Sequence, residues 1–165
     1  MQAITVIPLQ AGSARLDEVA EPSSEEGALL VQTLAVGVCG TDLEISQGEY
    51  GWAPPGRDRL VLGHESLGRV LEAPAGSGLA AGDLVVAIVR QPDPEPCPSC
   101  AAGEWDMCRN GRYTEHGIKG LHGYGRERWR ASAGRLVKLD PALGLAGVLL
   151  EPASVVAKAW EQIDR

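Results

Sequence analysis

The hydrophobic positions of this chain fall into short runs of Val, Leu, Ile and Ala, separated by glycine and proline. β-Branched and aliphatic residues between such turn residues are typical of strands. The runs that predict strands are 3–8, 27–38, 67–73, 82–89, 123–131 and 134–139. Strands therefore outnumber helices, and the pattern predicts a mainly β fold with short helices.

Two segments have the pattern of helices. Residues 41–48 (TDLEISQG) place Leu43 and Ile45 among polar residues and end at a glycine, which predicts a short helix. In 152–163, apolar residues recur at helical spacing, with Pro152 in the first turn. The chain is therefore expected to end on a helix.

The proline-rich stretch 91–107 interrupts the strand pattern. Its prolines and its pair of closely spaced cysteines indicate an excursion rather than a core element. A length of 165 residues fits one domain with a hydrophobic core. We expect that domain at 1–150, with a cysteine-containing lobe at 90–110, followed by a helix at 151–165.

The charge balance argues against some classes of partner. With 15 basic and 22 acidic residues, the chain has a net charge of -7 and offers no basic face to phosphate backbones or anionic lipids. No apolar run reaches the roughly 20 residues that span a bilayer, and the first residues do not resemble a signal peptide. We expect a cytoplasmic protein that binds a small molecule, with no nucleic acid or membrane partner.

The stretch VGVCGTD places Cys39 between two glycines. Three interpretations of this cysteine are open: a buried apolar residue, a reactive thiol, or a metal ligand. The other three cysteines (Cys97, Cys100 and Cys108) form a cluster far downstream. In a reducing compartment, that distribution favours metal binding or catalysis over disulfides.

His64 and Glu65 interrupt an apolar segment, LVLGHESLGRV. Burying both is costly unless they are hydrogen-bonded or bind a cation. In one interpretation His64 caps a turn and Glu65 faces water. In the other they join Cys39, because thiolate, imidazole and carboxylate together are a ligand set of zinc, which is catalytic when a fourth position stays open. The glycines expected to let the backbone turn beside these ligands are Gly37, Gly40 and Gly63.

These motifs resemble those of the zinc-dependent medium-chain dehydrogenases, which are alcohol dehydrogenase-like enzymes. Their catalytic domain carries Gly-x-Cys-Gly-(Thr/Ser)-Asp and then Gly-His-Glu, and GVCGTD and LGHESLGRV match both in order and spacing. GDLVVAIV resembles the strand that follows, and YTEHGIKGLHGYGRERW and LLEPASVVAKAW are similar to the microbial glucose 1-dehydrogenase branch. The resemblance implies a GroES-like, partly open β-barrel as the catalytic domain.

The resemblance also implies a catalytic zinc ion. Its ligands would be Cys39, His64 and Glu65, with Glu151 supplying or water-bridging the remaining position. The hydroxyl of Thr41 would hydrogen-bond the reacting alcohol and begin a proton relay. Thr41 also lies at the expected start of the helix over 41–48. Its alternative role is therefore that of a helix N-cap.

The same resemblance implies a sugar-binding site. In the glucose dehydrogenase branch, the glutamate that corresponds to Glu115 contacts the sugar. The substrate-binding residues implied are therefore Thr41, Glu65, Glu115 and Glu151. From composition alone, Glu115 is equally well interpreted as a solvated loop residue.

The downstream cysteines have the spacing C-x2-C-x7-C, which resembles the last three ligands of the family's four-cysteine structural zinc lobe. The expected position of the first ligand is Pro94, which has no ligating side chain. Candidates to complete a tetrahedral site are Asp93, Glu95 and Asp106. A lobe without zinc, and a disulfide between Cys97 and Cys100, are the alternatives.

Zinc has no redox chemistry of its own, so a nicotinamide cofactor, NAD or NADP, would accept the hydride. A Rossmann domain would be signalled by G-x-G-x-x-G, and the sequence contains none. We therefore assign no cofactor-binding residue to this chain and expect the Rossmann domain outside it. The helix at 151–165 resembles the family's segment that leads into that domain. The chain is then a fragment or single domain of a longer enzyme, which we favour, or a natural half whose cofactor domain is a separate chain, and we expect it to be inactive alone.

The function that the resemblance implies is that of a glucose (aldose) 1-dehydrogenase. Zinc would polarise the C1 hydroxyl of the sugar, and hydride transfer to nicotinamide would give the lactone. Two alternatives stay open: a dehydrogenase of another polyol or alcohol, and a zinc-binding structural or interaction module without redox chemistry. We expect the full-length enzyme to be a homo-oligomer.

Overall fold

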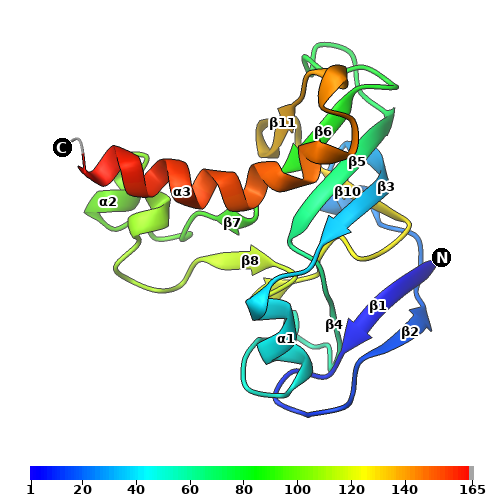
Figure 1. Cartoon of the computed structure of the whole chain (residues 1–165), viewed down its shortest axis with the longest axis vertical. Helices are drawn as coiled ribbons and strands as arrows, with labels where there is room; N and C mark the ends of the chain where they lie inside the picture. The colour runs from blue at the N-terminus through cyan, green and yellow to red at the C-terminus, as the bar shows by residue number, and fades with distance from the viewer. Residues whose placement is uncertain (164–165) are drawn as a thin grey trace.

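A computed structural model describes residues 1–163, which form three sheets and several short helices (Figure 1). The strands are β1 (Gln2–Val6), β2 (Arg15–Glu18), β3 (Leu29–Gly37), β4 (Leu60–Val61), β5 (Glu65–Glu72), β6 (Leu84–Ala87), β7 (Arg90–Gln91), β8 (Thr114–His116), β9 (Gly120–Leu121), β10 (Arg128–Ala131) and β11 (Leu136–Lys138). The α-helices are α1 (Gly40–Ser46), α2 (Pro98–Ala101) and α3 (Leu150–Ile163). The 3₁₀ helices are η1 (Ser24–Glu26), η2 (Trp105–Met107), η3 (Ala133–Arg135) and η4 (Pro141–Leu149). The mainly β class with short helices is confirmed.

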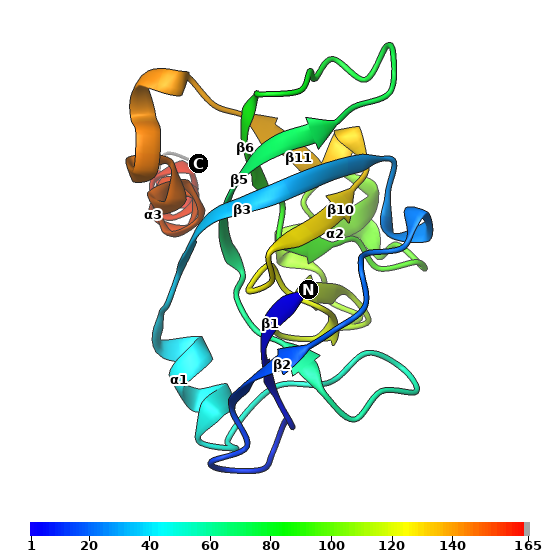
Figure 2. The ribbon, with the colours of Figure 1, turned by 90° about the vertical axis from the view of Figure 1, so that its right-hand side faces the viewer.

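The largest sheet has the strand order β10-β3-β5-β6-β11, and all its pairs are antiparallel. It curls around a core in which Leu29 and Val31 of β3 pack with Trp129 of β10, and all three side chains are fully buried (Figure 2). Because alternate residues of a strand share one face, these apolar positions hold the register of β3 in the sheet. The sheet is thus a rigid frame for whatever lies at its strand ends.

Two smaller sheets complete the β-structure of the described residues. One has the order β2-β1-β4 and the other the order β7-β8-β9, in which β8 and β9 run parallel. Val6, Ile45 and Leu60 form a buried cluster that anchors α1 against the first of these sheets. Helix α1 is therefore fixed by packing as well as by its own hydrogen bonds.

Several predicted strands are shorter than expected. The run 82–89 contains β6 at Leu84–Ala87, and the run 134–139 contains β11 at Leu136–Lys138, because η3 covers Ala133–Arg135. The pattern predicts a strand over 123–131, whereas β10 begins at Arg128. The backbone N–H groups of Gly123, Tyr124 and Gly125 donate to carbonyl oxygens of residues 61–63 instead of extending the ladder between β10 and β3. These nonlocal bonds draw 123–125 toward the segment just before β5.

The segment Pro141–Ile163 is apolar enough, by length and composition, to cross a membrane, which the sequence analysis did not anticipate. It is not one straight helix, because Gly144 (φ 50°, ψ -134°) breaks η4. The regular helix α3 has 14 residues, about 21 Å at 1.5 Å per residue, which is shorter than a hydrocarbon core of roughly 30 Å. A single segment of this kind is weak grounds for a membrane span.

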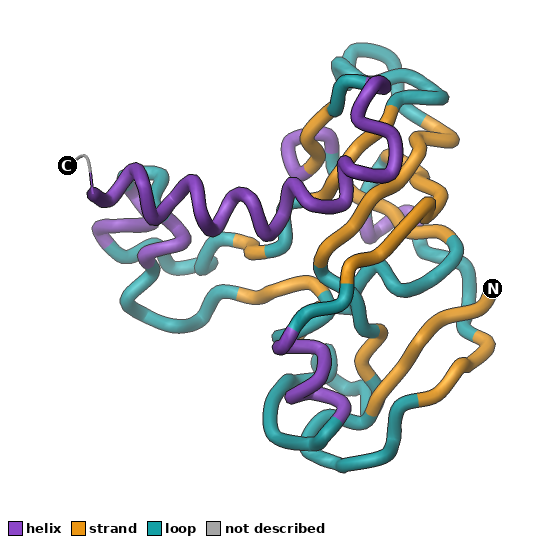
Figure 3. The backbone as a smooth tube through the Cα atoms, in the orientation of Figure 1, coloured by secondary structure: helices purple, strands orange, loops and turns teal. Residues whose placement is uncertain are grey.

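The chain between β7 and β8 forms a separate projection, drawn as loops and short helices in Figure 3. It contains α2 and η2 and all three downstream cysteines. Helix α3 runs past it, and Lys158 of α3 forms an ion pair with Asp106 of η2 at 3.1 Å. We call residues 92–112 the cysteine lobe.

Candidate metal centre

Antiparallel pairing of β3 and β5 brings the first candidate ligands together. Gly37, the last residue of β3, pairs with Glu65, the first residue of β5. Cys39 lies two residues beyond Gly37, and His64 lies just before Glu65. As a result the Sγ of Cys39 is 3.2 Å from Nε2 of His64, although 25 positions separate them in the sequence.

The ligand atoms of Cys39, His64 and Glu65 all lie within 4.8 Å of one another. His64 and Glu65 are buried, and Cys39 is half-buried. Glu65 therefore does not face water, and the interpretation of this pair as a turn cap beside a solvated carboxylate is wrong. Sulfur, nitrogen and oxygen donors at this spacing can converge on one zinc ion.

Two glycines shape the backbone here, and a third does not. A Cβ on Gly37 would lie 1.9 Å from Oε2 of Glu65, so only glycine leaves room for that carboxylate. Gly63 has φ +91°, a region in which residues with a Cβ are strained. Gly40 has neither a close neighbour nor a positive φ, so its expected role beside the ligands is wrong.

Asp42 connects the two ligand-bearing segments. Its Oδ2 accepts a hydrogen bond from the backbone N–H of Cys39 at 3.1 Å, and its Oδ1 lies 3.5 Å from Nδ1 of His64. Burial by itself would raise the pKa of Asp42, but the interactions with His64 and the Cys39 N–H outweigh it and lower this pKa. Asp42 is therefore an anion directed at the imidazole.

His64 responds to the same contacts. Burial disfavours its charged form, but Asp42 and then Cys39 stabilise the imidazolium and raise the pKa of His64 to about 9. Zinc binds neutral imidazole, so zinc binding would release this proton.

The donor set fits a zinc ion. Among the described residues, neither Nδ1 of His64 nor Oδ1 of Asp42 has a hydrogen-bond partner. A metal on Nε2 of His64 would leave the ring proton on Nδ1, facing the carboxylate of Asp42. That is the usual carboxylate–histidine–metal arrangement.

Thr41 and Glu151 lie on helices near this group. The N-cap of α1 is Cys39, so Thr41 is in the first turn of α1 and its alternative role as N-cap is wrong. Glu151 is in the first turn of α3, outside the 4.8 Å group. Burial raises the pKa of Glu151, and although His64 opposes this shift, Glu65 adds to it. The charges of His64 and Glu65 therefore act on Glu151, although Glu151 is not part of the ligand cluster.

Glu115 is buried in β8 rather than solvated in a loop, so the loop interpretation is wrong. Its Oε1 accepts a hydrogen bond from Nε of Arg90 at 2.9 Å. Its charge contributes to the raised pKa of Glu151. Glu115 and Glu151 thus lie within electrostatic range of each other.

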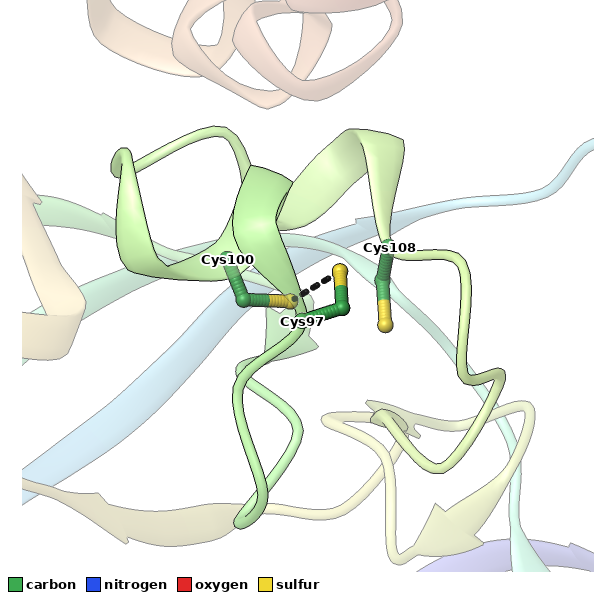
Figure 4. Close-up of side chains that lie close together, drawn as sticks. All are labelled: Cys97, Cys100 and Cys108. Carbon is green, nitrogen blue, oxygen red and sulfur yellow. Dashed lines mark hydrogen bonds between the residues drawn. The ribbon is translucent and has the colours of Figure 1, made fainter.

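The cysteine lobe forms a second group of candidate ligands. The Sγ atoms of Cys97, Cys100 and Cys108 lie within 4.8 Å of one another, and those of Cys97 and Cys100 are 3.7 Å apart (Figure 4). All are free thiols, so the alternative disulfide is not formed. Hydrogen bonds from the backbone N–H of Arg109, and then of Cys100, lower the pKa of Cys97 to about 6, which favours a metal-binding thiolate.

The three carboxylates considered as a fourth lobe ligand have different partners. Oδ2 of Asp93, a buried residue, lies 3.6 Å from Sγ of Cys108. Glu95 instead pairs with Arg112, and Asp106 pairs with Lys158. Of the three, Asp93 is therefore the candidate with a contact to a lobe cysteine, although the mutual 4.8 Å group does not include it.

Two residues of this region had no assigned role in the sequence analysis. Asp42 lies three residues after Cys39, the spacing at which a side chain caps a helix start, and this local signal could have identified it. Arg90 has no comparable signal, because its contact with Glu115 depends on the pairing of β7 with β8.

Comparison with known proteins agrees with this geometry. Residues 25–141 match the family described as "Alcohol dehydrogenase GroES-like domain". The chain belongs to this family. The GroES-like fold and the resemblance to zinc-dependent medium-chain dehydrogenases are thereby confirmed.

Relatives of high similarity include glucose dehydrogenases. The chain is 44% identical to a glucose 1-dehydrogenase of Methanocella arvoryzae and 46% identical to one of Thermoproteus tenax, covering 98% of this chain and 45% of each relative. A Haloferax mediterranei glucose dehydrogenase solved in complex with NADP, Zn and gluconolactone has a TM-score of 0.84 and 39% identity, with 98% of this chain and 45% of that chain covered. The GroES-like chain therefore spans about half the length of these relatives.

Proposed function

We propose that this GroES-like chain is the catalytic domain of a zinc-dependent, NAD(P)-linked glucose (aldose) 1-dehydrogenase. The observation that carries the proposal is the convergence of Cys39, His64 and Glu65 at the ends of β3 and β5. It is supported by glucose 1-dehydrogenase relatives that match almost the whole chain. A structural relative that contains NADP, zinc and gluconolactone supports the cofactor and product classes.

In this proposal the ligand cluster would hold zinc, and neighbouring side chains would orient the ligands. Cys39, His64 and Glu65 would bind the ion, and Asp42 orients His64 through Nδ1. Glu151 supplies or water-bridges the remaining position. When bound, zinc would act as a Lewis acid on the C1 hydroxyl of the sugar.

The remaining steps belong to side chains of this chain. The Thr41 hydroxyl accepts a hydrogen bond from the C1 hydroxyl and passes its proton toward solvent. A bound nicotinamide cofactor would supply the acceptor for the hydride of C1. Glu115 and Glu151 accept hydrogen bonds from other sugar hydroxyls, which fixes C1 beside Thr41. The products are the lactone, the reduced cofactor and a proton, so atoms and charge balance.

We propose that residues 1–150 form the GroES-like catalytic domain and that the helix predicted at 151–165 connects it to a cofactor domain. The structure has this helix as α3 (Leu150–Ile163), and residues 164–165 lie outside the described part of the chain. NAD or NADP would be bound outside these 165 residues, because the sheets of the described residues are not a doubly wound parallel sheet. We further predict a cytoplasmic homo-oligomer without nucleic acid or membrane partners. Its four free cysteines fit a reducing compartment.

Steady-state kinetics of the zinc-loaded, full-length gene product test this proposal. We expect the highest kcat/KM with glucose or a related aldose, and lower values with galactose, xylose, sorbitol and simple alcohols. A preference for sorbitol or an alcohol would instead assign another dehydrogenase activity. No oxidation of any of these compounds, with either NAD or NADP, would contradict a redox function and favour a structural zinc module.

The isolated residues 1–165 are the matched control for this assay. We expect them to bind zinc but not to oxidise glucose, because the hydride acceptor would have no binding site. Turnover by this chain alone would overturn the proposed division between domains.

A further inference from the structure

Arg90 holds Glu115 from the neighbouring strand. The two residues are paired in the β7–β8 ladder, and Nε of Arg90 donates to Oε1 of Glu115 at 2.9 Å. The guanidinium also lies over the ring of Tyr113, with its carbon 4.1 Å from the ring centroid. A guanidinium is planar and carries its donors in a fixed fork, so stacking on one face sets the direction of every N–H.

A second donor of Arg90 points into the cysteine lobe. Its Nη1 donates to the backbone carbonyl of Asp106 at 2.8 Å. Asp106 lies in η2, two residues before Cys108, so the position of that carbonyl depends on how the lobe is folded around its cysteines. One rigid side chain thus connects the lobe to a buried carboxylate near the candidate zinc site.

The same turn of the lobe also contacts α3, the helix that carries Glu151. The Asp106 side chain forms an ion pair with Lys158 at 3.1 Å, and Lys158 lies on α3, the helix that begins with Glu151 in its first turn. Figure 1 shows α3 running from the large sheet across the lobe. Turn η2 therefore contacts α3, which carries Glu151, and also Arg90 of β7, whose side chain binds Glu115.

We propose that Arg90 is a positioning residue that fixes the Glu115 carboxylate and couples its orientation to the fold of the cysteine lobe. This inference rests on the proposed sugar dehydrogenase function, in which Glu115 binds the substrate. Arg90 acts on the sugar through Glu115. Its loss therefore weakens sugar binding more than it slows the chemical step.

Kinetics of Arg90 variants in the full-length, zinc-loaded protein test the positioning role. Arg90→Ala should raise the KM for glucose about 10- to 100-fold and lower kcat far less, because a substrate contact is misplaced while the zinc ligands are intact. Arg90→Lys keeps the positive charge but lacks the planar guanidinium. Its KM for glucose should therefore lie between that of the wild type and that of Arg90→Ala. Arg130→Ala is the matched control, since Arg130 pairs with Glu72 at 3.0 Å and not with Glu115. Unchanged KM in Arg90→Ala would overturn the proposal.

A double-mutant cycle tests the coupling to the lobe. Cys108→Ser should raise the KM for glucose in the wild-type background but add little in the Arg90→Ala background, because the connection is already broken. Cys100→Ser is a second variant for the case in which Cys108→Ser does not fold. Additive effects of the two substitutions, or no effect of either cysteine variant on KM, would contradict coupling through Arg90.

Hydrogen exchange separates failure of this inference from failure of the proposed function. If the wild-type protein oxidises no sugar, the proposed function fails, but exchange of the 114–119 backbone amides still reports on β8. These amides should exchange faster in Arg90→Ala and in Cys108→Ser than in the wild type. In the double variant they should exchange no faster than in either single variant. Unchanged exchange in both single variants would contradict the structural connection itself.

Discussion

The two cysteine-containing clusters of this chain are built in opposite ways. Cys39, His64 and Glu65 come from segments far apart in the sequence and meet because β3 pairs with β5 inside a packed sheet. The three cysteines of the lobe lie within one short excursion and meet through local turns. The first cluster inherits the rigidity of the core, whereas the second depends on its own loop and on any metal that it binds.

This difference predicts how the cluster of Cys39, His64 and Glu65 responds to loss of zinc. Dialysis against a strong chelator should lower glucose oxidation by the full-length protein on the order of a thousandfold, because the proposed Lewis acid supplies several kcal/mol. The far-UV circular dichroism should change little, since the sheet holds the ligands without the ion. Added zinc should restore activity, and full activity in metal-free protein would contradict the account.

The rigid cluster should also depend on Asp42. Asp42→Asn keeps a hydrogen-bond acceptor for the Cys39 N–H but removes the charge facing His64. We expect the zinc affinity to fall about 10- to 100-fold, measured by competition with a chromophoric chelator. Asp58→Asn, at an exposed position, is the control. Equal zinc affinities for the two variants would show that Asp42 does not support His64.

The close packing of Gly37 against the Glu65 carboxylate gives a further test of the rigid cluster. Gly37→Ala places a Cβ against the Glu65 carboxylate and should cost about 1–3 kcal/mol in the free energy of unfolding, measured with urea. Gly40→Ala is the matched control, because no atom lies within 4 Å of its Cβ position. A similar stability of both variants would mean that Glu65 moves freely and is not fixed by the sheet.

The smallest effect is expected away from both clusters. Hydrogen bonds from Thr5 and then Arg15 lower the pKa of Asp17 in β2. A lowered pKa stabilises the folded state above the unfolded value of about 3.9, and this contribution disappears as the pH falls through the folded value. Asp17→Asn should therefore lower Tm slightly at pH 7 but not near pH 2. The control variant Glu18→Gln should leave Tm unchanged at both pH values. A pH-independent difference would contradict the role of the charge.

The sequence predicted the elements whose residues pack locally or repeat regularly. Aliphatic runs identified β3 and β5, and helical spacing identified α3. The grouping of Cys39 with His64 came from the zinc-ligand chemistry of the side chains and then from the family resemblance, since no local pattern states that β3 pairs with β5. The zinc ligands and the sugar-binding residues remain predictions.

Nonlocal contacts account for what the sequence did not predict. β7 and β9 have two residues each, too few for a periodic signal. The contact of Arg90 with Asp106 joins segments 16 positions apart and exists only once the lobe has folded. The late start of β10 has the same origin, because 123–125 bonds to 61–63.

The zinc content of Cys39→Ala, measured by elemental analysis on folded, full-length protein, tests the central claim most directly. We predict one zinc ion fewer per chain than in wild type, no glucose oxidation, and a circular dichroism spectrum like that of wild type. Cys108→Ala, the matched variant of the lobe, should retain the zinc ion at Cys39. An unchanged zinc content in Cys39→Ala, or unfolding that accompanies the loss, would contradict a catalytic metal centre at Cys39, His64 and Glu65.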